Sequence, residues 1–410
     1  MILSSYPESI YIHIPFCKSK CPYCDFASWA GKENLIDEYF DSLMSEIKTK
    51  CEAYLSYGTG EPANRRTGGP ANQRTGGPAN RRIALSPYRP IAPSPIRSIF
   101  IGGGTPSLIA PEYYEKLFKE LDRFYKIDKD CEITLELNPG TARDDYLTGY
   151  KKLGINRVSI GVQSFNDDVL VTLGRKHSVN ETIEAINMAK RAGFENINFD
   201  FIFSVPGMTK EIWVESICRA LEFNPKHISA YSLIIEGGTP FENIYKDPKK
   251  LPGDDISYEY YFELCNILKK AGFIHYEVSN FAKPGFECFH NLTYWSAKEY
   301  FAFGVGAHRF INGLRTSNIR ELKTYILHPY REEITDFPIN HAFEKIMLTS
   351  RLTKGFDLNL IQEISAKSQV EIKNMLNDLS NAGFLELSRD KIHLTEKGLF
   401  VNNEILLKLI

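Results

Sequence analysis

The sequence predicts an α/β fold, with strands and helices in alternation, followed by a smaller helical module that ends in a hairpin. Two observations carry this prediction. Six strand-like runs lie between residues 9 and 234, and a helical pattern follows each of the first five. After residue 340 the pattern changes to helices followed by a hairpin, which suggests a winged-helix shape. A chain of 410 residues is also too long for one compact core.

The strand–helix units follow one another along the chain. Strands are predicted at 9–16, 98–101, 131–137, 157–162, 197–203 and 227–234. Amphipathic helices are predicted at 33–50, 111–125, 142–153, 179–192 and 209–223. The helix at 179–192 carries a capping box, Ser178 with Glu181, and a stop at Gly193. Such units form an open doubly wound sheet or a barrel, and both place an active site beyond the carboxyl ends of the strands.

The predicted division of the chain is 1–235, 236–335 and 336–410. The middle part holds a helix that ends at Gly272 and an aromatic-rich stretch to about residue 315. The last part holds helical patterns at 341–353, 358–366 and 369–382 before the hairpin. Between residues 340 and 410, nine Lys and Arg residues balance nine Asp and Glu residues, which is a poor surface for phosphates. No nucleic-acid partner is expected.

An octapeptide repeat at 59–82 interrupts the first helix–strand connection. It contains no large apolar residue, so it is predicted to be disordered, together with the Pro-rich tail to residue 95. Five arginines against one glutamate allow a nucleic-acid role. A tolerated surface insertion is favoured over that role because of the composition.

Charge and hydropathy exclude several classes of protein. With 49 basic and 51 acidic side chains, no global field attracts nucleic acid or an anionic membrane. No run approaches the roughly 18 apolar residues of a membrane-spanning helix, and the first residues do not read as a secretion signal. A cytoplasmic protein with reduced cysteines is therefore expected.

Three of the eight cysteines fall within eight residues, as Cys17-Lys-Ser-Lys-Cys21-Pro-Tyr-Cys24 at the end of a strand. Three thiolates at this spacing suit three irons of a cubane cluster and leave the fourth iron open to a small molecule. A zinc site is the alternative, but zinc sites usually add a second cysteine pair or a pair of histidines.

The run from Tyr11 through these three cysteines resembles the signature of the radical S-adenosylmethionine (SAM) superfamily. Within it, the chain is similar to the branch that contains oxygen-independent coproporphyrinogen III oxidase and the HemW-type heme chaperones. The likeness extends from about residue 10 to 400, apart from the repeat. It implies a partial (β/α)6 barrel, a 4Fe-4S cluster on Cys17, Cys21 and Cys24, and SAM bound to the open iron.

The resemblance also assigns the SAM contacts. Gly103, Gly104 and Thr105 follow the second strand, where glycines let the backbone approach a ligand. The buried carboxylates of Glu136 and Asp200 need partners, and ribose hydroxyls are suitable ones. The remaining positions that match SAM or cluster contacts in the family are Tyr11, Tyr23, Gln163 and Arg175.

Two features favour a heme chaperone over the oxidase. Asp25 and Phe26 follow Cys24, where the oxidase has a further cysteine; with 16 residues before Cys17, the oxidase's longer leading arm is not expected here. The run His290-Asn-Leu-Thr-Tyr-Trp295 resembles the His-Asn-x-x-Tyr-Trp motif of the chaperone branch. An imidazole beside aromatic rings suits heme, so His290 is the candidate ligand, with a buried structural histidine and a Cys288 thiolate as alternatives.

Three functions remain open at this point. The first is a heme chaperone without coproporphyrinogen oxidase activity, whose partners are heme and an acceptor protein such as a membrane-associated respiratory enzyme. The second is the decarboxylating oxidase that forms protoporphyrinogen IX, and the third is a redox-sensing DNA regulator. The cysteine spacing and the His290 motif favour the first. A homodimer is compatible with it.

Overall fold

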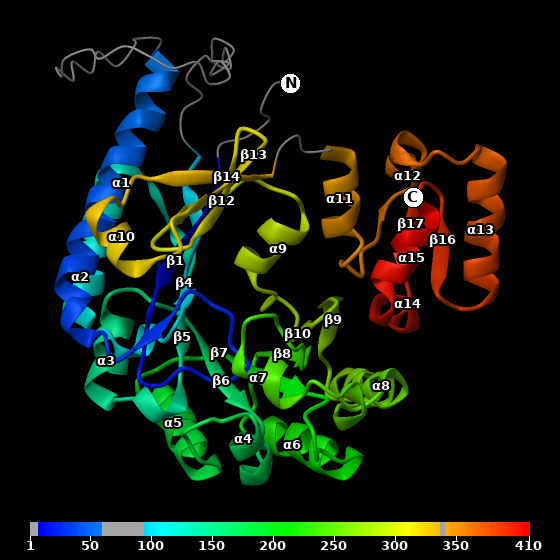
Figure 1. Ribbon diagram of the computed structural model, residues 1–410, viewed down its shortest axis with the longest axis horizontal. Helices are drawn as coiled ribbons and strands as arrows, with labels where there is room; N and C mark the ends of the chain where they lie inside the picture. Colours follow the sequence, from blue (N-terminus) through cyan, green and yellow to red (C-terminus); the bar gives the residue numbers. More distant parts are fainter. Residues whose placement is uncertain (1–6, 60–93, 337–340) are drawn as a thin grey trace.

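The computed structural model describes residues 7–59, 94–336 and 341–410. Its centre is a nine-stranded sheet in the order β11-β1-β4-β5-β6-β7-β8-β10-β9 (Figure 1). The strands are β1 (Ser9–Ile14), β4 (Ile96–Gly103), β5 (Ile127–Leu137), β6 (Arg157–Gln163), β7 (Asn196–Phe203), β8 (His227–Ser232), β9 (Ile274–Glu277), β10 (Asn280–Ala282) and β11 (Phe301–Phe303).

The strand order decides between the two folds left open by the sequence. Strands β1, β4, β5, β6, β7 and β8 form a parallel series, in which β4 to β8 each pair with the preceding member of the series. A doubly wound sheet reverses its order at a switch point, whereas a barrel adds strands in one direction. The sheet is therefore a partial barrel, and the six predicted strands are confirmed. Strand β11 extends one edge in parallel, and β10 and β9 extend the other edge antiparallel.

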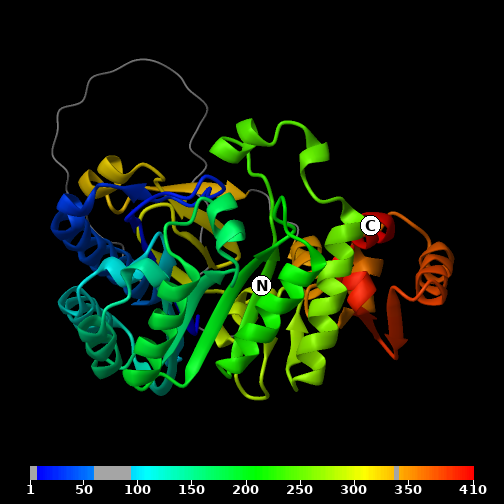
Figure 2. The same cartoon turned by 90° about the horizontal axis from the view of Figure 1, so that it is seen from below.

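Helices cover the outer face of the sheet (Figure 2). Those of the first 235 residues are α1 (Ile36–Thr59), α2 (Pro111–Phe124), α3 (Asp144–Lys152), α4 (Asp167–Thr172), α5 (Val179–Arg191) and α6 (Lys210–Glu222). The capping box predicted at Ser178 and Glu181 is present at the start of α5. The short helix α4 was not predicted, because six residues are too few for a helical period to show.

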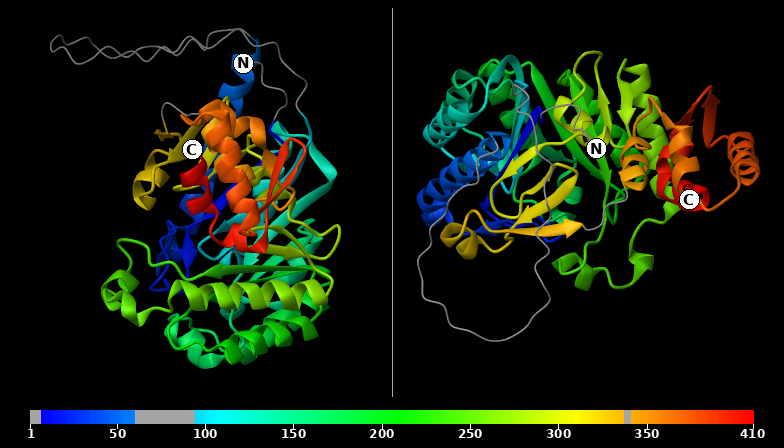
Figure 3. Two further views of the ribbon diagram at one scale, coloured as in Figure 1. Left: turned by 90° about the vertical axis from the view of Figure 1, so that its right-hand side faces the viewer. Right: turned by 90° about the horizontal axis from the view of Figure 1, so that it is seen from above.

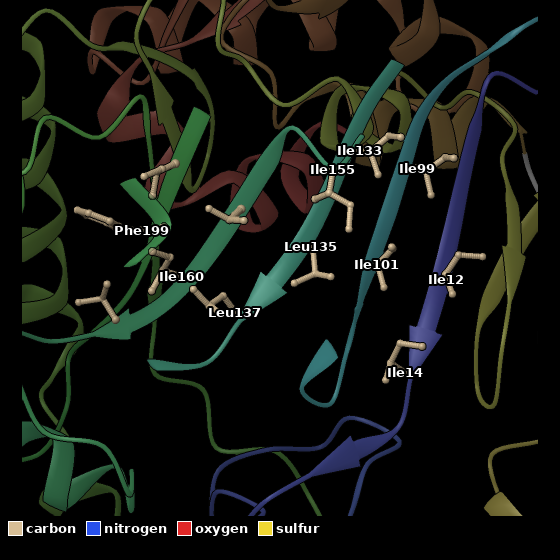
Figure 4. Close-up of a cluster of buried hydrophobic side chains, with 14 of the residues drawn as sticks. Ile12, Ile14, Ile99, Ile101, Ile133, Leu135, Leu137, Ile155, Ile160 and Phe199 are labelled. Atoms are coloured by element: carbon tan, nitrogen blue, oxygen red, sulfur yellow. The ribbon is translucent and has the colours of Figure 1, made fainter. Parts of the chain in front are cut away.

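Alternating residues of each strand face opposite sides of the sheet. Ile12, Ile99, Leu135 and Ile160 belong to the main apolar core, and the isoleucines and leucines of neighbouring strands lie in one layer (Figure 4). The intervening residues are largely polar and hydrogen bond to one another across the barrel interior, as Ser98 does with Ser9. The interior therefore offers polar side chains to a ligand, while the outer layer stabilises the fold.

Residues 236–336 add smaller elements around the barrel. The helices are α7 (Pro240–Ile244), α8 (Asp254–Lys270), α9 (Phe289–Trp295) and α10 (Leu322–Leu327). Strands β12 (His308–Ile311), β13 (Leu314–Asn318) and β14 (Glu332–Asp336) form a separate three-stranded sheet. The cysteine loop has its own pair of short strands, β2 (Phe16–Cys17) and β3 (Trp29–Ala30).

The last residues form a module with its own apolar core beside α8 (Figure 3). Its elements are α11 (His341–Thr349), β15 (Phe356–Asp357), α12 (Leu358–Ile364), α13 (Gln369–Asn381), β16 (Leu385–Ser388), β17 (Lys391–Leu394), α14 (Glu396–Phe400) and α15 (Asn402–Leu409). Helices followed by the β16–β17 hairpin agree with the winged-helix shape expected from the sequence. Phe400 packs its ring against Tyr258 and Tyr261 of α8.

The predicted disorder at 59–95 falls, apart from Thr59, Ser94 and Pro95, outside the described residues. The three-part division of the chain stays a prediction. None of the described helices is long and apolar enough to cross a membrane.

Candidate functional site

The three clustered cysteines lie in one loop at the carboxyl end of β1. Cys17 ends β2 and is buried, and a turn in which the Cys24 N–H donates to the Cys21 carbonyl brings the other two together. All three thiols are free. Burial raises the pKa of Cys17 and of Cys24, so both favour the thiol form in the absence of a cation. An iron–sulfur cluster supplies the positive charge that stabilises thiolates at such positions.

The glycine turn after β4 packs against this loop. Gly103 has φ +113°, and a Cβ there would lie 2.5 Å from the His13 ring. A Cβ on Gly104 would lie 2.7 Å from the Phe16 carbonyl oxygen. The Thr105 hydroxyl donates to the Cys17 sulfur at 3.6 Å. Glycine is required at Gly103 both by the backbone angle and by the approach of β1, so the turn exposes backbone rather than side chains next to the cysteines.

Glu136 lies at the carboxyl end of β5, and Asp200 lies in the carboxyl half of β7, three residues before its end. One oxygen of Glu136 accepts the Gly103 N–H at 3.0 Å. Asp200 accepts hydrogen bonds from Ser159 and Asn198, each at 2.8 Å. Burial, and then the neighbouring Asp200, raise the pKa of Glu136 to about 7. Burial also raises the pKa of Asp200. These carboxylates are near enough to influence each other, and a donor-rich ligand would stabilise their charged forms.

Arg175 connects the strand ends to the cysteine loop. Its guanidinium lies 3.4 Å from the Cys21 sulfur and 3.4 Å from the Tyr23 hydroxyl, and it donates to the Gly161 carbonyl. The Gln163 side chain lies over Gly161, next to the Arg175 guanidinium. Its backbone has φ +64°, a strained angle for a residue other than glycine. The structure therefore brings Tyr23, Gln163 and Arg175 together beside the cysteines, as the sequence predicted for residues of one site.

The Tyr11 side chain, on β1, points into the barrel interior near Glu136. Its hydroxyl donates to His13 Nδ1 at 3.0 Å, because His13 Nε2 donates to the Ala27 carbonyl. The nearby Glu136 contributes to raising the pKa of Tyr11, although burial is the larger cause. His13 was not among the predicted residues, yet it supports both the cysteine loop and Gly103. The sequence could have indicated His13, because it lies two residues after Tyr11 and therefore on the same face of the strand.

His290 lies at the opposite, amino-terminal end of the barrel strands. It is 1% exposed, and its ring nitrogens contact Ser98 at 2.9 Å and Tyr294 at 2.8 Å. Helix α9 carries it there, and the carboxylate of Glu132 on β5 accepts the N–H groups of Phe289 and His290. The structure thus places His290 beside Tyr11, with ring centroids 6.4 Å apart, but at the end of the barrel opposite the cysteine loop.

A chain of hydrogen bonds sets the His290 tautomer. Thr293 donates to the Phe289 carbonyl, so Ser9 donates to Thr293 and Ser98 donates to Ser9. Ser98 must then accept from His290 Nδ1–H. His290 Nε2 is left with its lone pair, which accepts the Tyr294 hydroxyl. Nε2 is the atom available to a metal, and the Tyr294 hydroxyl covers it.

Arg157 is a second buried group that sequence reasoning missed. It lies in the barrel interior, 1% exposed, where Thr134 is 3.5 Å away and its Nε has no partner among the described residues. Cys288, Glu132 and Asp200 surround it closely enough to raise its pKa, although burial alone would lower it. A buried arginine has no periodic signature of its own within a strand, so the sequence did not single it out.

Comparison with known proteins agrees with this geometry. The chain is 35% identical to the heme chaperone HemW of Haemophilus influenzae, over 98% of this chain and 97% of that protein. It is 33% identical to HemW of Bacillus subtilis, over 97% of this chain and 98% of that protein. The chain belongs to the HemW family. Residues 89–220 match the radical SAM superfamily, and residues 338–401 match the HemN C-terminal domain.

The chain shares its fold with a solved enzyme. Coproporphyrinogen III oxidase (HemN) from Escherichia coli superposes with a TM-score of 0.74 at 20% sequence identity, covering 99% of this chain and 90% of that enzyme. At this identity the likeness concerns the fold alone. It supports the partial barrel and the additional carboxyl-terminal module predicted from the sequence.

The radical SAM family implies a 4Fe-4S cluster and SAM, and the residues of this chain fit both. Three free cysteines share one loop, which leaves a fourth iron without a protein thiolate. Beside them the glycine turn has no space for a side chain, and two half-buried carboxylates with raised pKa values, Glu136 and Asp200, face the same region. Such carboxylates are stabilised when a ligand donates hydrogen bonds to them.

Proposed function

We propose that this chain is a heme chaperone that holds a SAM-coordinated 4Fe-4S cluster, binds heme and delivers heme to an acceptor protein. The full-length similarity to proteins named heme chaperone HemW carries the proposal. The convergence of the cysteine loop, glycine turn and acidic strand ends supports it. A membrane-associated respiratory enzyme as acceptor, a homodimer and a cytoplasmic location stay predictions of the same hypothesis.

The cofactor-binding roles follow from the positions of the side chains. Cys17, Cys21 and Cys24 would hold the cluster, while Thr105 and Arg175 direct donors at two of their sulfurs. When bound, the cluster and SAM supply one-electron chemistry. Glu136 and Asp200 would accept hydrogen bonds from the ribose. The other SAM contacts of the proposal are Tyr11, Tyr23, Gly103, Gly104 and Gln163.

His290 is the proposed heme ligand, and the structure defines what ligation requires. Its Nε2 is unprotonated, and burial lowers the pKa of His290 to about 3, so the ring stays neutral and able to bind iron. The Tyr294 hydroxyl must first leave Nε2. Because His290 is 1% exposed, α9 must also move for heme to reach it. Cys288 is a weaker candidate, since its buried thiol donates to Glu132.

A paired assay on one cluster-loaded sample tests the function. The full chain is reconstituted under anaerobic conditions, titrated with heme, and separately supplied with coproporphyrinogen III and SAM. We expect a shifted Soret band and no release of carbon dioxide. Carbon dioxide in proportion to SAM consumed would instead identify an oxidase.

The cluster assignment is tested on the same preparation. Cys17→Ala, Cys21→Ala and Cys24→Ala should each lose the iron–sulfur absorption band. Cys218→Ala is the control, because Cys218 is an exposed cysteine on α6. A full band in all three loop variants would remove the cluster from the proposal.

A further inference from the structure

Among the described residues, a second group of ligand-type side chains converges outside the cysteine loop. Cys265, His275 and Glu396 each offer one ligand atom, and these atoms all lie within 4.8 Å of one another. They come from three elements that are distant in sequence, namely α8, β9 and α14. Two belong to the extension of the barrel and one to the carboxyl-terminal module.

The two barrel residues are held firmly. Cys265 is 2% exposed on the inner face of α8, one turn after Tyr261. The His275 ring stacks on Phe281, with centroids 4.2 Å apart and an angle of 15° between the planes. The backbone of His275 is also fixed, because its carbonyl accepts the Thr353 hydroxyl at 2.8 Å. Neither side chain needs a large movement to bind a common ion.

The module positions the third residue. Glu396 is the first residue of α14, after the N-cap Thr395. Phe400 at the end of this helix packs against Tyr258 and Tyr261, with ring centroids 5.3 and 5.5 Å apart. This packing holds the start of α14 against α8, so the Glu396 carboxylate reaches the pair formed by Cys265 and His275.

Among the described residues, the present partners of these three side chains leave His275 weakly hydrogen bonded and Glu396 without a salt bridge. His275 Nε2 has two long contacts, 3.4 Å to the Tyr261 hydroxyl and 3.4 Å to the Val278 carbonyl. Within the described parts of the chain, no ion pair involves Glu396, while burial and then this carboxylate raise the pKa of Cys265. A hydrogen bond with the Tyr261 hydroxyl and, more weakly, the charge of Lys269 oppose this effect. A bound cation would stabilise the thiolate and the carboxylate together, since it attracts both.

We propose that Cys265, His275 and Glu396 bind one divalent transition-metal ion of the zinc type. Sulfur, imidazole nitrogen and carboxylate oxygen together are the ligand set that zinc prefers, and the Cys265 proton is released to solvent on binding. Zinc bond lengths place ligand atoms roughly 3.5 Å apart, so the set must contract by about 1 Å. Rotation of the half-buried Glu396 side chain accommodates this.

An open groove borders the Glu396 side of the proposed site. Glu396 lines this groove, which has a volume of about 460 Å³ and is also bordered by Phe262, Lys269, Thr353 and His393. Water from the groove can therefore complete a tetrahedral site. The ion would link the barrel to the carboxyl-terminal module, and this role is independent of the cluster, SAM and heme.

The test uses the full chain with its cluster already loaded, so that Cys17, Cys21 and Cys24 do not compete for zinc. After a chelator wash, the protein is titrated with zinc, and cobalt is used as a spectroscopic probe. We expect stoichiometric zinc beside the iron and a thiolate-to-cobalt charge-transfer band. Cys265→Ala should lose both, and His275→Gln and Glu396→Gln should bind at least about tenfold more weakly. Cys218→Ala and His393→Gln are the controls.

Thermal unfolding gives a second readout that does not depend on the buried cysteine. Zinc should raise the unfolding temperature of the unaltered chain by more than that of Glu396→Gln, whose half-buried side chain keeps its shape. Zinc uptake by Cys265→Ala equal to that of the unaltered chain would overturn the proposal. So would cobalt binding without a thiolate band, or equal zinc stabilisation of the chain and of Glu396→Gln.

Discussion

The Glu132 carboxylate accepts the backbone N–H of His290 at 3.2 Å. This contact joins β5 to the amino-terminal end of α9, and the same carboxylate accepts the N–H of Phe289 and the thiol of Cys288. A carboxylate at a helix start satisfies donors that have no partner inside the helix. Glu132 therefore anchors the helix that carries the His-Asn-x-x-Tyr-Trp motif.

Replacing this anchor should loosen the helix. In Glu132→Gln the side chain loses its charge and one of its two acceptor oxygens, and a neighbouring positive charge on Arg157 loses its counter-charge. We expect the free energy of unfolding to fall by about 1–3 kcal/mol, measured by urea denaturation. Asp130→Asn, an exposed change two residues earlier on the same strand, is the control. Equal stability of the two variants would contradict the anchoring role.

Glu136 should make the stability of the unliganded chain depend on pH. Its pKa rises from 4.5 in the unfolded chain to about 7 in the folded chain, so the folded state binds the proton more tightly between these values. The free energy of unfolding should therefore decrease as pH rises through this range. Asp200 and Arg157 also influence the pKa of Glu136, and Asp200 can still ionise when Glu136 is replaced.

Glu136→Gln removes this ionisable group, so the free energy of unfolding should depend less on pH between 4.5 and about 7. SAM binding should also become weaker, because the amide accepts fewer hydrogen bonds than the carboxylate. Thermal unfolding across the pH range and SAM titration measure the two effects. Glu52→Gln, at an exposed position on α1, should change neither. An unchanged slope in Glu136→Gln would show that another group causes the pH dependence.

Gly103→Ala should disrupt the turn beside the cysteines. Gly154 is a matched control, since it also has a positive φ, +91°, but a Cβ there meets no atom within 4 Å. Gly154→Ala should cost about 1 kcal/mol from backbone conformation. Gly103→Ala adds overpacking against His13, a further cost of about 1–3 kcal/mol, and should weaken SAM binding. Equal losses of stability, with SAM binding intact, would argue against the close approach.

Tyr294→Phe removes the hydroxyl that covers His290 Nε2. If His290 binds heme, this variant should bind heme more tightly than the unaltered chain, while His290→Ala should bind it more weakly. The lost hydrogen bond should also reduce stability by about 1 kcal/mol. Soret titrations of the three proteins measure the affinities. Identical affinities would assign His290 to positioning α9 rather than to ligation.

Local patterns were sufficient to predict much of the fold. The apolar alternation around Ile12 and the capping box at Ser178 depend on neighbours in sequence, and both are present as predicted. The choice between barrel and doubly wound sheet depends on which strands pair. That information is not local, and the resemblance to a known family supplied it.

Those candidate residues that lie near the carboxyl ends of successive strands could be grouped from the sequence. Glu136 and Asp200 could be placed at one edge because parallel strands end on the same side. His290 could not, because its contact with Ser98 spans 192 residues and depends on α9 folding back onto the barrel. Arg157 was missed for a related reason, since its surroundings come from several strands that only the folded chain brings together.

The position of α9 also bears on how two ligands could be loaded. Since α9 is joined to Ser9, Ser98 and Glu132, it occupies the amino-terminal end of the barrel interior. If heme binds His290, displacement of α9 opens this end, whereas the cysteine loop lies at the opposite end. A nucleotide beside the cysteines and a macrocycle beneath α9 would then enter by separate routes, so neither would have to leave before the other is loaded.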